Sequence, residues 1–137
     1  MENSQLDIPY REFVRKRAIF RVGGCEHCLQ VKHDKEKEDG SIFPAWKQLE
    51  CSHYHKRALL SVRYDAFNGA GICADCHREL ENNRDAHTKW FKSHIGEHEY
   101  ELLKDRMRNM SKIDKEVLWL YYKQKIAELD VELSDKA

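Results

Sequence analysis

Near the start of the chain, apolar residues recur at helical spacing between Pro9 and the Gly23-Gly24 pair. Side chains three and four positions apart share one face of a helix, and Pro9 suits a first helical turn. The sequence therefore predicts a helix here, preceded by a loose start over residues 1–8. Its apolar face comprises Tyr10, Phe13, Val14 and Ala18. Basic residues lie mostly off that face, which fits either a solvated surface or a helix that contacts phosphates.

Two short apolar stretches in the middle of the chain predict strands, over Trp46–Tyr54 and roughly Ala70–Ile72. A long connection joins them, and we expect a helix to begin directly after the second, at Cys73–Cys76. Upstream, the mixed-charge run of residues 31–41 ends in an Asp39-Gly40 turn signal. This run favours a solvated loop or a short hairpin.

Three helices are predicted in the last part of the chain, over Arg84–Ile95, Glu97–Arg108 and Ser111–Leu133. Gly96 is a natural end for the first of them, and Ser111-x-x-Asp114 is a variant of the capping box for the third. Their apolar stripes are Tyr100, Leu103 and Met107 on the second helix, and Ile113, Val117, Leu120 and Tyr121 on the third. Such stripes usually belong to a core, and the last is also suited to a seam between two copies.

No repeat, low-complexity tract or linker divides the 137 residues. We therefore expect one α+β domain spanning residues 1–137. It would comprise an N-terminal helix and first cysteine pair at 9–30, a strand–strand–helix core at about 46–83 and a helical part at 84–133.

The composition is that of a polar globular protein, with 41% apolar and 35% charged residues. The sequence contains no apolar run long enough to cross a membrane and no signal-peptide pattern, so we expect a cytoplasmic protein. Basic and acidic residues balance at 24 each. This balance argues against a general polyanion binder held by bulk charge, but leaves room for a local basic patch.

Cysteines form two Cys-x-x-Cys pairs, Cys25 with Cys28 and Cys73 with Cys76. Four thiolates are a complete tetrahedral set for Zn²⁺ and leave no open position for water, so the pairs predict a structural zinc site. A redox dithiol is the alternative for either pair. The remaining Cys51 is expected to be a small buried residue beside the site, with an auxiliary ligand as the other option.

A second group of residues has the chemistry of phosphodiester hydrolysis. His53, at the end of the first predicted strand, is the candidate general base, because a neutral imidazole accepts a proton near pH 7. His77, at the start of the helix, is the candidate ligand of a catalytic Mg²⁺ or Mn²⁺. Glu81 lies one turn further on the same face and is a second ligand candidate. Asn68 is expected to pin the long loop so that His53 keeps one tautomer.

Arg57 and Arg63 are the candidate phosphate contacts, since a guanidinium offers a planar fork to two oxygens. Each assignment has a structural alternative. Asn68 alone is an ordinary turn residue, and Arg63 could pair with Asp65. The remaining histidines are assigned to the surface or to satisfied core positions, and they are His27, His33, His87, His94 and His98.

The stretch from Cys51 to about Leu103 resembles the HNH (ββα-metal) endonuclease superfamily. The segments CSHYHKR, VRYDAFN and ICADCHREL, followed by WF and IGE, look most like phage NinG/Rap-type recombination nucleases with a Cys₄ zinc site. In that family a histidine base ends the first strand, an asparagine lies in the loop and a metal-site histidine lies on the helix. His53, Asn68 and His77 match these three positions.

One position departs from the family. Many members place Asp or His directly before the base, as a metal ligand, and this chain has Ser52 there. The first metal ligand therefore stays open among His55, Asp65, Glu81 and Cys51.

The resemblance implies a metal-dependent DNA endonuclease that leaves 5′-phosphate and 3′-hydroxyl ends. Branched recombination DNA of a phage would be its substrate, the host cytoplasm its location and a homodimer its possible form. The alternative is a catalytically inactive zinc module that binds nucleic acid or protein, which Ser52 and the zero net charge favour. A thiol redox protein is a third reading, and it requires one Cys-x-x-Cys pair to be free.

Overall fold

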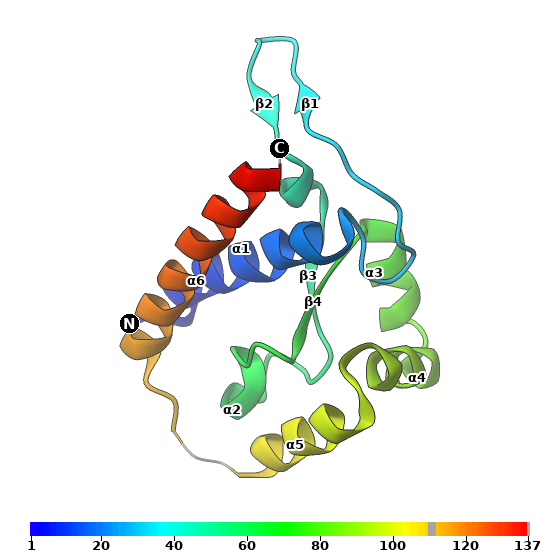
Figure 1. Ribbon diagram of the computed structural model, residues 1–137. Coiled ribbons are helices and arrows are strands. Elements are labelled where there is room, and N and C mark those ends of the chain that lie inside the picture. Colours follow the sequence, from blue (N-terminus) through cyan, green and yellow to red (C-terminus); the bar gives the residue numbers. More distant parts are fainter. Residues whose placement is uncertain (110–111, 137) are drawn as a thin grey trace.

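A two-stranded antiparallel hairpin lies near the centre of the computed structural model, which describes residues 1–109 and 112–136 (Figure 1). Strands β3 (Glu50–His53) and β4 (Gly69–Ile72) form it, with Glu50 opposite Ile72 and His53 opposite Gly69. Helix α3 (Ala74–Glu81) follows β4 directly. The predicted strand–strand–helix order is therefore present, within a mixed α+β fold.

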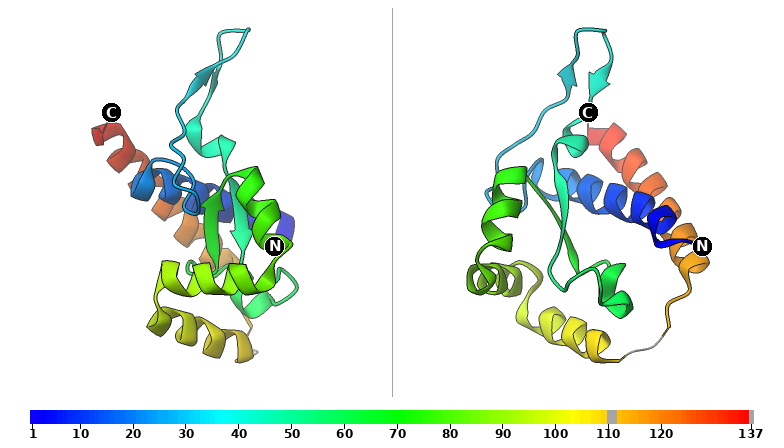
Figure 2. Two further views of the ribbon diagram at one scale, coloured as in Figure 1. Left: turned by 90° about the vertical axis from the view of Figure 1, so that its right-hand side faces the viewer. Right: turned by 180° about the vertical axis from the view of Figure 1, so that it is seen from behind.

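Further elements surround this unit on several sides (Figures 1 and 2). In chain order they are α1 (Asn3–Val22), β1 (Lys35–Glu36), β2 (Ile42–Phe43), the 3₁₀ helix η1 (Ala45–Gln48), α2 (Leu60–Arg63), α4 (Arg84–Ile95), α5 (Glu97–Arg108) and α6 (Lys115–Lys136). The β1–β2 pair projects as a narrow hairpin, which was one of the two options predicted for residues 31–41.

Helix α1 packs directly against β4, and two glycines allow this close approach. A Cβ atom added to Gly71 would lie 2.7 Å from the Cβ of Ala18, and one added to Gly69 would lie 2.5 Å from the Tyr10 hydroxyl. Neither distance is open to a real side chain. The four residues predicted for the apolar face of this helix, Tyr10, Phe13, Val14 and Ala18, are all buried.

The loose start predicted for residues 1–8 is wrong, because α1 begins at Asn3. A capping box closes its first turn: the Glu2 side chain accepts from the Gln5 backbone, and the Glu2 N–H donates to Gln5 Oε1 at 2.8 Å. Leu6 is fully buried, and its burial stabilises the additional turns of the helix. Pro9 consequently lies inside the helix and not in its first turn.

The first predicted strand is also shorter than expected. Trp46 belongs to η1, which starts after Pro44, and β3 covers only Glu50–His53. Pro44 is extended and introduces the 3₁₀ turn, an arrangement that proline's fixed φ favours.

Helix α6 packs along α1 through a face that the sequence pattern did not indicate. Tyr122 and Ile126 are buried there, whereas Val117 and Leu120 of the predicted stripe are 59% and 63% exposed. The core assignment is therefore wrong for Val117, Leu120 and Tyr121, whereas Ile113 of the same stripe packs against the core. The helix begins at Lys115, and Asp114 accepts a hydrogen bond from the Val117 N–H at 3.1 Å, as an N-cap does. Ser111 of the predicted capping box lies outside the described residues.

Helices α4 and α5 have the predicted bounds, and Gly96 separates them with a φ of 89°. Tyr100 and Leu103 are buried, as expected, beside Phe91 and Tyr54. The Tyr54 and Phe91 rings stack at 4.3 Å, which fastens the helix pair to the end of β3. No helix in the described part of the chain is long and apolar enough to cross a membrane.

Candidate functional site

The four cysteines of the two Cys-x-x-Cys pairs form one cluster. The Sγ atoms of Cys25, Cys28, Cys73 and Cys76 lie within 4.8 Å of one another, and those of Cys28 and Cys73 are 3.9 Å apart. A tetrahedral zinc with Zn–S bonds of about 2.3 Å needs sulfurs roughly 3.8 Å apart, so the cluster fits a zinc ion. The predicted four-cysteine group is thus brought together and can hold a metal such as zinc.

The protonation of this cluster also favours a cation. Burial raises the pKa of the Cys25 thiol, but N–H donors from Cys28 and Cys73, at 3.4 and 3.3 Å, bring that pKa below its ordinary value. The pKa of Cys76 is raised strongly, by burial and by the neighbouring sulfurs. With the pKa of Cys76 raised in this way, the cluster can carry four thiolates only when a positive ion lies between them.

Glu26, inside the first cysteine pair, is a buried acid that sequence reasoning missed. Its side chain is fully buried, and it accepts the Gly71 N–H at 3.0 Å and approaches His94 Nε2 at 2.9 Å. Burial raises its pKa, but these two partners bring it below the ordinary value. The carboxylate therefore ties the cysteine loop to β4 and α4. His94 has the structural role that was expected of it.

A cleft of about 750 Å³ lies between α1, β3, α3 and the start of α4. Four predicted site residues line it, namely His53, Arg57, His77 and Glu81. Residues that were not predicted also line it, including Arg11, Arg15, Glu50, Lys56, Arg84 and His87. The cleft therefore combines imidazoles, carboxylates and several cations.

His53 lies at the end of β3, and its imidazole is held neutral. Burial, assisted by the charges of Arg57 and Arg63, lowers the pKa of His53 to about 4. Its ring contacts Tyr10 at 5.4 Å between centroids. The buried Nε2 atom has no hydrogen-bond partner among the described residues. An unpartnered, neutral imidazole nitrogen can accept a proton at pH 7, as a general base must.

His77 on α3 is held between two carboxylates. Its Nδ1 atom lies 2.7 Å from Glu50 of β3, and its Nε2 atom lies 3.0 Å from Glu81 on the same helix. The contact with Glu81 follows from the i,i+4 spacing that the sequence shows. Glu50 was missed, because only the pairing of β3 with β4 brings it beside α3. Glu50 and Glu81 contact opposite nitrogens of the ring, so the three side chains do not converge on one point. His77 and Glu81 together have donor types that suit a divalent cation.

Ser52 is buried, so it offers no ligand to the cleft. Of the four residues left open for that role, Glu81 and Cys51 line the cleft, whereas His55 and Asp65 do not. Burial raises the pKa of the half-buried Cys51 to about 12, which keeps it a thiol and a poor ligand. The sequence expectation of full burial for Cys51 was too strong.

Asn68 is fully buried and does not line the cleft. Its Oδ1 atom accepts the His55 N–H at 2.8 Å, and its Nδ2 atom donates to the His55 carbonyl at 3.1 Å. These two bonds pin the start of the long connection, as expected. They act on the backbone two residues beyond His53 and not on the His53 ring.

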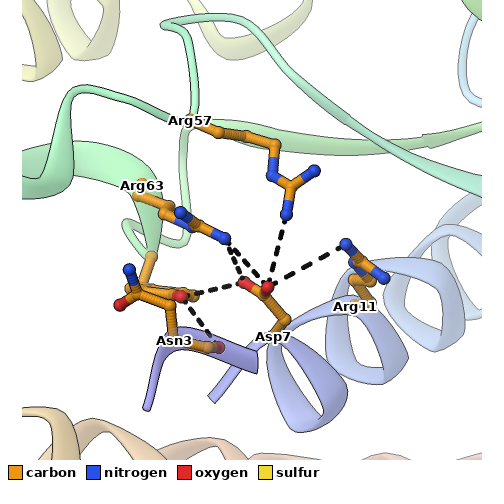
Figure 3. A network of polar contacts seen from close by, with 6 residues as sticks. Asn3, Asp7, Arg11, Arg57 and Arg63 are labelled. Carbon is orange, nitrogen blue, oxygen red and sulfur yellow. Dashed lines mark hydrogen bonds and ion pairs between the residues drawn. The ribbon is translucent and has the colours of Figure 1, made fainter. Parts of the chain in front are cut away.

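Arg63 does not line the cleft, and its partner is neither Asp65 nor a surface residue (Figure 3). Its Nη2 atom contacts Asp7 of α1 at 2.8 Å, and the Tyr64 hydroxyl donates to the same carboxylate at 2.8 Å. Asp65 instead pairs with Arg106 at 2.6 Å. The expected phosphate contact at Arg63 is therefore not supported, because that guanidinium is 12% exposed and already used.

Arg57 is in contrast 53% exposed and faces the cleft. It touches Asp7 only at 3.4 Å, and Arg11 of α1 approaches the same Asp7 oxygen at 4.0 Å (Figure 3). Arg15 and Arg84 add two further cations to the lining. Helix α1 thus contributes basic side chains to the cleft, which was one of the two readings of its polar face.

Comparison with models of known protein families, with curated proteins and with solved structures finds no match for this chain. The argument for function therefore depends on the geometry of the cleft and the cysteine cluster.

Proposed function

We propose that the protein is a metal-dependent DNA endonuclease of the HNH type that hydrolyses phosphodiester bonds in the cleft. One observation carries the proposal. A neutral imidazole on β3 and a second imidazole on α3, held between Glu50 of β3 and Glu81 of α3, line the same cleft together with several arginine and lysine side chains. These are the three needs of diester hydrolysis: a base for water, ligands for a divalent metal and positive charge for the phosphate.

In this proposal His53 takes the proton of the attacking water. Its depressed pKa keeps the imidazole free at neutral pH, and burial against Tyr10 keeps its ring in place. His77 and Glu81 would hold a Mg²⁺ or Mn²⁺ ion, with Glu50 orienting the His77 ring through Nδ1. When bound, such an ion polarises the phosphate and stabilises the leaving 3′-oxygen. The cations that line the cleft neutralise charge on the phosphates of the strand.

The zinc cluster supports this role from a distance. Cys73 and Cys76 flank the start of α3, so a structural zinc would fix the helix that carries His77. Asn68 fixes the loop that follows His53. The helix that carries His77 and the loop that follows His53 would thereby both be held in place, as a preorganised site requires.

The second candidate is a zinc module that binds nucleic acid without cutting it. The buried Ser52 favours it, because the residue directly before His53 supplies no ligand to the cleft. The cationic wall serves binding equally well.

A cleavage assay tests the proposal and separates the two candidates. Supercoiled plasmid and a synthetic four-way junction are incubated with the protein and Mg²⁺, Mn²⁺ or EDTA. We expect cutting with metal, none with EDTA, and a loss of about 10²–10⁴-fold in rate for His53→Ala, the usual contribution of a general base. His98→Ala is the matched control, because His98 is exposed on α5 and should cut normally. Normal cutting by a folded His53→Ala protein would refute the assignment of the base, and binding without any cutting would favour the zinc module.

A further inference from the structure

The arginines around Asp7 form a charged cluster that the hydrolysis of a single phosphate does not require. Three guanidinium groups, from Arg11, Arg57 and Arg63, converge on one carboxylate (Figure 3). One negative charge faces three positive ones, so the cluster keeps a net positive charge. Arg63 and the Tyr64 hydroxyl hold the carboxylate on its buried side, at 2.8 Å each.

The outer two arginines are placed differently from Arg63. Arg11 and Arg57 are 45% and 53% exposed, both line the cleft, and both direct a nitrogen at Asp7 Oδ2, at 4.0 and 3.4 Å. Their guanidinium groups therefore lie close together although they come from α1 and from the connection after β3. Each guanidinium has five N–H donors. Asp7 engages one nitrogen of each, which leaves the other donors for an anion in the cleft.

The position of Arg11 and Arg57 relative to His77 also bears on their role. In Figure 1 the first half of α1 and the helix α3 lie on opposite sides of the β3–β4 hairpin. Arg11 of α1, His53 of β3 and His77 of α3 all line the cleft, so its lining includes residues from both helices and from the strand. A phosphate held at His53 and His77 would leave the arginine pair facing the neighbouring part of the same strand.

We propose that Arg11 and Arg57 form a clamp for a backbone phosphate next to the one that is hydrolysed, with Asp7 setting their convergence. This inference rests on the proposed function, and it names the substrate class. The site takes a polynucleotide with successive phosphates in preference to an isolated diester. Arginine suits the task because its planar fork binds two phosphate oxygens at once.

Two measurements on Arg11→Gln, Arg57→Gln and the double variant test the clamp. The first is binding of a fluorescein-labelled DNA duplex without added Mg²⁺ or Mn²⁺, by anisotropy, over a series of salt concentrations. The slope of log K against log [salt] should become shallower by about one unit for each arginine removed and about two for both. The second compares hydrolysis of plasmid with that of bis(4-nitrophenyl) phosphate, a diester with a single phosphate. The variants should lose rate only on plasmid.

Arg108→Gln is the matched control, since Arg108 is exposed on α5 and does not line the cleft. An unchanged salt slope in the clamp variants, or an equal loss of rate on both substrates, would overturn the clamp. The outcome is separable from that of the proposed function. Wild-type protein that cuts neither substrate, but whose salt slope depends on Arg11 and Arg57, would retain the clamp and refute hydrolysis.

Discussion

The two ends of the β3–β4 hairpin are anchored by clusters of opposite electrical character. At the Ile72 end, four thiol groups gather in a space that cannot stay tightly packed and charged without a cation. At the His53 end, three arginines gather around Asp7 and leave an excess of positive charge. The four-cysteine cluster can be completed by a metal ion, whereas the arginine cluster pairs charges within the protein and keeps an excess of positive charge.

The cysteine cluster and the arginine cluster therefore contribute differently to the protein. The cysteine cluster is mostly buried and closed, so it serves stability. The arginine cluster has a buried part, Arg63 with Asp7. Its other part, Arg11 and Arg57, is about half exposed and lines the cleft. The arginine end therefore combines stability with an exposed positive charge, whereas the cysteine end serves stability alone. Variants at the two ends should behave differently.

The largest effect is expected at the cysteine end. Cys76→Ser should lose zinc and unfold, because a structural zinc contributes about 10–16 kcal/mol in small zinc domains, as much as a whole domain's stability. Circular dichroism and zinc analysis measure both. Cys51→Ser is the control and should keep fold and zinc, since Cys51 is not in the cluster. A well-folded Cys76→Ser protein without zinc would contradict the four-cysteine site.

A smaller but clear effect is expected at the arginine end. Arg63→Met should cost about 3–5 kcal/mol in the free energy of unfolding, because it leaves the buried Asp7 carboxylate without its closest cation. Arg57→Met should cost under about 1 kcal/mol, since that guanidinium is half exposed. Urea unfolding at fixed zinc measures both, and both variants should retain zinc. Equal losses for the two variants would show that the buried and exposed halves of the cluster are not distinct.

The smallest effect is the dependence of stability on pH that a single histidine contributes, about 2 kcal/mol between pH 6 and 4.5. Burial lowers the pKa of His53, His55 and His87 to about 4. The unfolded chain, with ordinary histidine pKa values near 6.5, takes up protons that the folded chain refuses. Stability should therefore be complete above about pH 6.5 and fall as the pH drops toward 4, by about 1.4 kcal/mol per pH unit for each histidine.

His87→Phe isolates this contribution from acid loss of zinc. The variant should show a dependence on pH that is shallower than wild type by about 1.4 kcal/mol per unit between pH 6 and 4.5. Urea unfolding at several pH values measures the difference. Parallel curves for the two proteins would mean that His87 titrates normally in the folded state.

Much of the fold was accessible from local patterns. The bounds of α4 and α5, the buried face of α1 and the four-cysteine group all follow from spacing within short segments. The face of α6 was misjudged because the apolar run of residues 117–122 places apolar side chains on every side of the helix there. Val117 and Leu120 are exposed, and Tyr122 is buried only because α1 lies beside it. Periodicity cannot choose between two apolar faces when tertiary packing decides.

Part of the candidate site could likewise be predicted from local spacing in the sequence. His77 and Glu81 share a helix face, so their spacing shows their proximity. Asp7 and Arg63 are separated by most of α1, the cysteine loop and β3, and nothing local relates them. Glu50 meets His77 only after the hairpin forms. Long-range charge pairs of this kind become visible only in three dimensions.

The packing of α6 along α1 sets an order of events during synthesis of the chain. Tyr122 contacts the ring of Tyr10 at 5.2 Å and donates its hydroxyl to the Tyr64 carbonyl. A nascent chain therefore exposes the apolar face of its first helix until residues 122–126 leave the ribosome. Asp7 and Arg11 lie on that helix. Residues 122–126 follow both cysteine pairs in the chain, so the part of α1 that α6 covers is packed only after both pairs have been made.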